Sequence, residues 1–179
     1  IENALRVLDD RGELLFTTHA RGFELDPSIE TRFHVEDRTR KLVPPDFMLL
    51  DYEAAFTTVA HAAATHDVVA VTFHGGAEGV DARNLPFAEE EYYGEPRGDV
   101  VLFARRMVEA GADLVLGHGP HVVRAAERYK ERLIAYSLGN FATYYGISVA
   151  GIKGIAPILI ATLDGEGRFV EGEIVSTIQ

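Results

Sequence analysis

Short aliphatic runs alternate with segments of helical periodicity through the middle of the chain. Three of these runs predict buried strands, at Asp67–Phe73, Ala112–Leu116 and Arg132–Tyr136. Apolar residues at helical spacing predict helices over Ala54–Ala64 and Arg97–Ala110. Asp51 is a suitable N-cap for the first helix, and Gly111 stands where the second would end. This alternation predicts an α/β layered domain.

The first fifty residues have no clean period, and we expect them to form an irregular lead-in to the domain. A strand is expected at Glu13–Thr18, after a turn, and a short extended piece at Thr31–Val35. The pair Pro44-Pro45 is expected to close this lead-in. Residues 51–179 then form the domain itself.

The connections and the tail complete the expected architecture. Gly75 to about Pro96 predicts a loop long enough to be functional. A helical turn is expected over Val122–Tyr129. Ala156–Leu163 and Arg168–Ile178 flank a tight-turn sequence and predict an antiparallel hairpin. Parallel strands in the middle and an antiparallel tail predict a mixed sheet.

Composition narrows the range of functions. The net charge of −11 over 179 residues disfavours binding to the negatively charged phosphate backbone of a nucleic acid, so we expect no nucleic-acid partner. The chain has no cysteine, which excludes disulfides and thiolate zinc sites. No apolar run approaches the ~20 residues of a membrane helix. Because the chain begins at Ile1 and not at methionine, we expect it to come from a longer protein, and any membrane association to depend on segments outside it.

Histidines follow two of the predicted strands. His74 comes directly after the run that ends at Phe73, and two glycines and then Glu78 follow it. His118 and His121 follow the next predicted strand and are separated by a Gly-Pro turn. Ligands in α/β folds gather at the carboxyl edge of the sheet. These histidines therefore indicate one shared site, and the alternative is a turn with solvated or core histidines.

A divalent-metal site is the leading hypothesis for this cluster. His74, His118 and His121 would bind zinc, manganese or iron through neutral imidazole nitrogens. Glu78 is a candidate ligand, a group that orients a ligand, or a general base. Asn140 either caps a turn or reaches the same edge of the sheet. The other cations nearby are expected to be surface charges: Arg83, Arg97 and Arg124.

Three motifs in order along the chain carry a family resemblance. Residues 68–78, VVAVTFHGGAE, are similar to an apolar strand followed by His-Trp-Gly and a glutamate. Residues 110–122 are similar to the element Gly-Ala-Asp … Gly-His-His-Pro-His-Val, and residues 136–141, YSLGNF, match a further motif. Over about residues 51–145 the chain therefore resembles the poly-γ-glutamate capsule biosynthesis protein CapA family, of the calcineurin-like metallophosphoesterase superfamily.

The resemblance implies a four-layer α/β/β/α sandwich with a two-metal centre at the sheet edge. His74 corresponds to a single later histidine of the superfamily, and His118 and His121 to its Gly-His-x-His element. One departure is Gly119, where the family usually has histidine. Residues 1–50 resemble none of the earlier metal-binding motifs. The chain is therefore expected to be the second half of the full domain, with self-association or a separate N-terminal half covering its exposed sheet.

Two functions of different classes follow from the resemblance. In the first, the domain is a metal-dependent phosphoesterase-like hydrolase, with up to two divalent ions and His118, Asn140 and Glu78 as catalytic residues. Its substrate is a phosphoester or another anionic compound. In the second, the domain is a non-catalytic component of envelope polymer synthesis or export that binds an anionic polymer or a partner protein. Both place the protein at a bacterial cell envelope, in capsule or poly-γ-glutamate production.

Overall fold

A mixed four-stranded sheet lies at the centre of the molecule. The computed structural model describes residues 5–8, 14–17, 45–143 and 146–179. Within these ranges, the central sheet has the strand order β3-β6-β8-β7. The first three strands are parallel, and β7 pairs antiparallel with β8 at the edge. The strand bounds are Ala70–Phe73 for β3, Leu114–Gly117 for β6, Ala126–Tyr129 for β7 and Arg132–Ala135 for β8. The mixed α/β architecture predicted from the sequence is confirmed.

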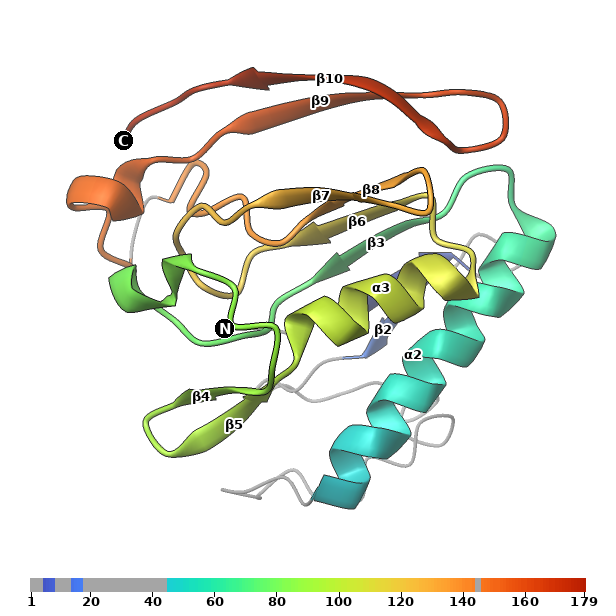
Figure 1. Ribbon diagram of the computed structural model, residues 1–179, viewed down its shortest axis with the longest axis horizontal. Helices are drawn as coiled ribbons and strands as arrows, with labels where there is room; N and C mark the ends of the chain where they lie inside the picture. The colour runs from blue at the N-terminus through green and yellow to red at the C-terminus, as the bar shows by residue number, and fades with distance from the viewer. Residues whose placement is uncertain (1–4, 9–13, 18–44, 144–145) are drawn as a thin grey trace.

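Two helices cover one face of this sheet (Figure 1). They are α2, Pro45–Thr65, and α3, Val100–Ala110. Their apolar sides meet alternate strand residues in one core, which includes Val59, Met107, Val115 and Ile134. Asp99 caps α3 by accepting a hydrogen bond from Leu102 N–H, and Gly111 ends it in the left-handed conformation, as its position predicts.

An antiparallel hairpin runs along the other side of the sheet (Figure 1). It consists of β9, Ile158–Leu163, and β10, Phe169–Val175, and it confirms the hairpin predicted at the end of the chain. Phe169 N–H donates to the carbonyl of Glu131, which ties the hairpin to the β7–β8 turn. Several of its aliphatic side chains are exposed, among them Ile158, Ile160, Val170 and Ile174. Self-association through this layer stays a prediction.

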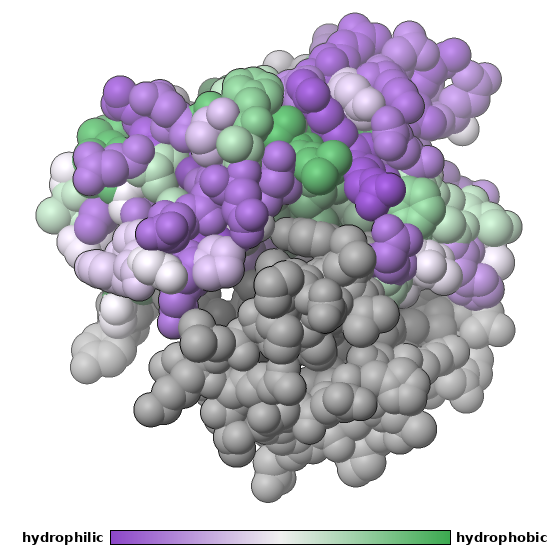
Figure 2. All heavy atoms as spheres, turned by 60° about the horizontal axis from the view of Figure 1, so that its bottom comes forward, coloured by the Kyte–Doolittle hydropathy of each residue, from purple (hydrophilic) through white to green (hydrophobic). Residues whose placement is uncertain are grey.

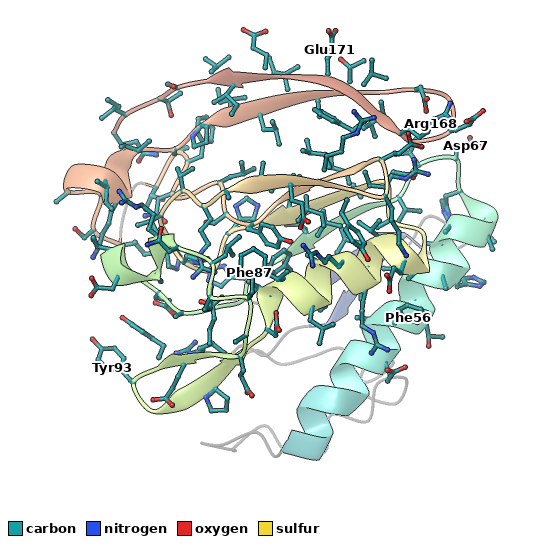
Figure 3. The ribbon with its side chains drawn as sticks, viewed as in Figure 1. Phe56, Asp67, Phe87, Tyr93, Arg168 and Glu171 are labelled. Carbon is teal, nitrogen blue, oxygen red and sulfur yellow. The ribbon has the colours of Figure 1, made fainter. Side chains whose placement is uncertain are left out.

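Smaller elements complete the description. A hairpin of β4, Glu90–Tyr92, and β5, Glu95–Gly98, stands apart from the main sheet. In Figure 3 the side chain of Tyr93, at the tip of this hairpin, points away from the body of the molecule. Short 3-10 helices occur at Val80–Arg83 and Gly151–Gly154. Near the N-terminus, β1, Leu5–Leu8, pairs with β2, Leu14–Thr17, which confirms a strand in the predicted stretch.

Two expectations are wrong in detail. α2 begins at Pro45, where Pro44-Pro45 was expected to close the lead-in, and a proline at the first helical position loses no hydrogen bond. Asp51 therefore lies inside α2 and not at its N-cap. The helical turn expected over Val122–Tyr129 is an extended segment that ends in β7. The extended piece expected at Thr31–Val35 lies outside the described residues.

Among the residues that are coloured in Figure 2, most of the surface is hydrophilic, and hydrophobic residues lie between the hydrophilic ones. This pattern agrees with the net charge of −11. Among the described residues, no helix combines the length and the hydropathy needed to cross a bilayer.

Candidate metal centre

The parallel pairing of β3 with β6 brings the two histidine loops together. His74 follows β3, and His118 follows β6, so both leave the sheet at the same edge. The backbone N–H of His118 donates to the carbonyl of Phe73 at 3.0 Å, which continues the ladder beyond the strands. The rings of His74 and His121 then face one another, with centroids 4.9 Å apart and planes inclined by 59°. The structure therefore brings together the rings of His74 and His121, two of the three histidines predicted to share one site.

Gly119 allows this approach because it packs directly against the backbone of the other loop. A Cβ added at Gly119 would lie 2.2 Å from the carbonyl oxygen of Gly75 and 2.5 Å from its nitrogen. The two loops are also joined by a hydrogen bond of 2.9 Å from Gly79 N–H to the carbonyl of Pro120. The glycine that departs from the family pattern is therefore required by the close packing of the loops here.

Asn140 fixes the orientation and the tautomer of the His121 ring. Its side-chain Nδ2 donates to the carbonyls of His121, at 3.0 Å, and Lys153, at 3.1 Å. The Oδ1 atom must therefore face His121 Nδ1, which donates to it at 2.7 Å. With the proton on Nδ1, Nε2 carries the free lone pair. Such a partner behind an imidazole is the usual arrangement around metal-binding histidines.

The Nε2 atoms of His74 and His121 are both buried and have no hydrogen-bond partner in the described part of the chain. Burial, with the nearby charges of His121 and His118, lowers the pKa of His74 from 6.5 to about 4. Burial and His121 likewise lower the pKa of His118. Neutral imidazoles are the form that binds metals. The buried and unpartnered Nε2 atoms of these two neighbouring rings fit a divalent cation.

The structure does not bring all the predicted ligands into one cluster. Over the described ranges, no group of three or more His, Asp or Glu side chains has the arrangement of a metal site. Glu78 lies 3.6 Å from a guanidinium nitrogen of Arg97, as one partner of an ion pair. Asn140 is buried, and its amide is occupied by contacts within the protein. Of the predicted ligands, His74 and His121 are the two whose rings the described structure places side by side.

Burial of the uncharged His74 makes the metal-free protein sensitive to acid. The unfolded chain binds a proton at this residue near pH 6.5, whereas the folded chain does so only near pH 4. Stability from this residue is therefore complete above pH 6.5 and is lost as the pH falls toward 4. We expect a loss of about 1–2 kcal/mol, after discounting the shift for partial exposure.

Urea unfolding between pH 4 and 7, with a chelator present, measures this loss. His74→Asn should flatten the pH dependence, and the control His61→Asn, at an exposed position on α2, should not change it. An unchanged slope in His74→Asn would contradict the assignment.

Sequence reasoning missed one group that supports the site. Arg124 was expected to be a surface charge, but its side chain is fully buried and makes two hydrogen bonds to Glu90, of 2.6 and 2.7 Å. Its Nε donates to the carbonyl of Ala82, and Glu90 also accepts from the N–H of Ala77. This buried ion pair links the segment after His74 to the residues between β6 and β7. The signal available was an arginine within the apolar run 122–126.

The sequence is similar to that of bacterial capsule synthesis proteins. Residues 17–145 match the family described as bacterial capsule synthesis protein PGA_cap. The PGA biosynthesis protein CapA of Bacillus subtilis strain 168 is 34% identical over 97 residues, which are 54% of this chain and 22% of that protein. The capsule biosynthesis protein CapA of Bacillus anthracis is 48% identical over 52 residues, 29% of this chain and 13% of that protein.

These matches cover only part of each relative, since this chain spans less than a quarter of either CapA protein. The mixed sheet with helices on one face is consistent with a metallophosphoesterase-like α/β fold. Because the family match extends over more than half of the sequence, the chain belongs to the bacterial capsule synthesis protein PGA_cap family.

Proposed function

We propose that this chain forms part of a metal-dependent hydrolase of the CapA type, which acts on a phosphoester or related anionic substrate in capsule polymer production at a bacterial cell envelope. The observation that carries the proposal is the pair of buried, unpartnered Nε2 atoms on His74 and His121. Their rings lie 4.9 Å apart at the carboxyl edge of the sheet, where such sites form. The names of the relatives support the link to capsule synthesis.

A divalent zinc, manganese or iron ion would be held by Nε2 of His74 and of His121, with His118 near enough for its charge to lower the pKa of His74. When bound, such an ion supplies an activated water and neutralises charge that develops on the substrate. The residues of this chain have separate tasks. Asn140 keeps the His121 ring in one orientation and one tautomer, and Gly119 holds the two loops at contact distance.

Metal analysis of the purified protein tests the proposal. His74→Ala and His121→Ala should each remove most of the bound metal, because each deletes a ligand nitrogen. Asn140→Ala should keep the ligands but weaken metal binding by about 10–100-fold, the usual effect of losing the partner of a ligating histidine. The control His61→Ala, at an exposed site, should keep the metal content of the parent. Equal metal content in all four variants would exclude the site.

A second function is favoured by one specific observation. Among the described residues, no third side chain completes a metal-binding cluster. A domain without a complete metal site would bind an anionic polymer or a partner protein and would not hydrolyse it. In that case polymer binding persists while the protein, supplied with manganese or zinc, fails to hydrolyse generic phosphoesters. Hydrolysis that is lost in His121→Ala would decide for the enzyme.

A further inference from the structure

Among the residues that the structure describes, the buried side-chain polar atoms without a hydrogen-bond partner lie on segments that backbone hydrogen bonds join. These atoms are His74 Nε2, His121 Nε2 and Arg97 Nε. The backbone joins their segments, because the N–H of Gly76 donates to the carbonyl of Arg97 at 3.1 Å. Leaving a buried polar group unpaired costs free energy, so such groups call for an explanation. Two lone-pair nitrogens beside one cationic donor suit a cation together with an anion.

The guanidinium of Arg97 is held in place without using its donors. Its Nη1 lies 3.6 Å from Glu78 Oε1 and its Nη2 lies 3.8 Å from Glu95 Oε2, both beyond hydrogen-bond distance. The ring of Tyr92 lies 5.3 Å from the guanidinium carbon. The side chain is 33% exposed, so a ligand can reach it. The two Nη groups of Arg97 are therefore oriented without being hydrogen-bonded to these carboxylates, whereas its Nε is buried.

Arg124 shows what a structural arginine looks like in the same part of the molecule. All three of its guanidinium nitrogens donate at 2.6 to 2.7 Å, two of them to Glu90 and one to a carbonyl. Its side chain has no exposed surface. Arg97 differs, because its Nη atoms lie beyond hydrogen-bond distance of their carboxylate partners and its side chain is 33% exposed. The Nη donors of Arg97 can therefore take a further anion, whereas the donors of Arg124 are already used.

We propose that Arg97 is a substrate-binding residue, which takes a phosphate or carboxylate group of the substrate beside the His74–His121 pair. The proposal rests on the proposed function, in which the histidines hold a cation. An arginine fork binds both kinds of oxyanion through two parallel hydrogen bonds. Because the backbone of Arg97 is bonded to that of Gly76, two residues after His74, such an oxyanion would be bound close to the residues that would hold the cation. Glu78 would repel the same group, which sets a limit on the affinity.

Calorimetric titration of the purified protein with two probes tests this assignment. The probes are inorganic phosphate and a short γ-linked glutamate oligomer, and the one that binds more tightly identifies the source of the oxyanion. Arg97→Gln should weaken binding at least about tenfold, the value of one charged hydrogen bond. Arg97→Lys should be intermediate, because it keeps the charge and loses the fork. Glu78→Gln should strengthen binding.

The control is Arg128→Gln, because Arg128 is exposed and lies on β7 at 4.0 Å from Glu131. It should bind both probes as the parent does. The proposal is overturned if the parent binds neither probe, or if folded Arg97→Gln and Arg97→Lys bind as the parent does. A loss of metal in both Arg97 variants would also overturn it, because the arginine would then act through the histidines. Metal retained in the histidine variants contradicts the proposed function separately.

Discussion

Replacing Arg124 with alanine is expected to lower the free energy of unfolding by about 3–5 kcal/mol, the range for removing one partner of a buried ion pair. The change leaves the Glu90 carboxylate buried, with the N–H of Ala77 as its remaining donor. It also frees the carbonyl of Ala82, which accepts from Arg124 Nε. Urea unfolding at neutral pH measures the loss.

Two comparisons make this result specific. Arg128→Ala removes an exposed arginine that lies 4.0 Å from its carboxylate partner, and it should change stability by less than about 0.5 kcal/mol. The double variant Arg124→Met with Glu90→Leu replaces the pair with apolar groups, and it should recover part of the loss, because no charge stays buried although the Ala77 N–H and the Ala82 carbonyl lose their partners. A double variant as unstable as Arg124→Ala would show that the pair is not the cause.

Gly119→Ala is expected to cost about 1–3 kcal/mol and to weaken metal binding together with stability. The added Cβ would lie 2.2 Å from the Gly75 carbonyl oxygen, so the two loops must move apart. The atoms that this Cβ would meet belong to the backbone of Gly75, which cannot rotate away as a flexible side chain can. Because His74 adjoins Gly75, its ring would move away from His121.

Thermal unfolding and metal analysis of the same preparation measure the two effects together. Gly165→Ala is the matched control, because a Cβ there meets nothing within 4 Å. It should preserve both stability and metal content. If Gly119→Ala lost stability but kept its full metal content, the loop contact would not determine the histidine geometry.

The strands and the histidine loops could be predicted because their signals are local. Each predicted central strand is an aliphatic run, and parallel pairing then places the residues that follow β3 and β6 at one edge. The pairing of Asn140 with His121 spans 19 residues, and no pattern in the sequence specifies it. The partnership of Arg124 with Glu90 spans 34 residues and was likewise not predictable.

The prediction of a helical turn over Val122–Tyr129 was wrong because this segment leads into a hairpin whose turn has an unusual sequence. Lys130 and Glu131 both have positive φ angles, of 46° and 63°, and join β7 to β8 as a two-residue hairpin. Such turns usually contain asparagine and glycine, so this sequence carried no hairpin signal. The β4–β5 hairpin has Tyr93-Gly94 at its turn, with φ angles of 54° and 74°. Its glycine was a usable signal within the predicted loop.

The backbone of His121 has a positive φ of 57°, which is uncommon for a residue with a side chain. The cost of this conformation is met when the chain folds, since Pro120 and Asn140 already hold the residue in place. Under the proposed function, capture of a cation would then require no rearrangement of the loop. We expect the rate of binding to depend on how fast the ion releases its own hydration water. The rate should therefore vary more with the identity of the metal than with the viscosity of the solvent.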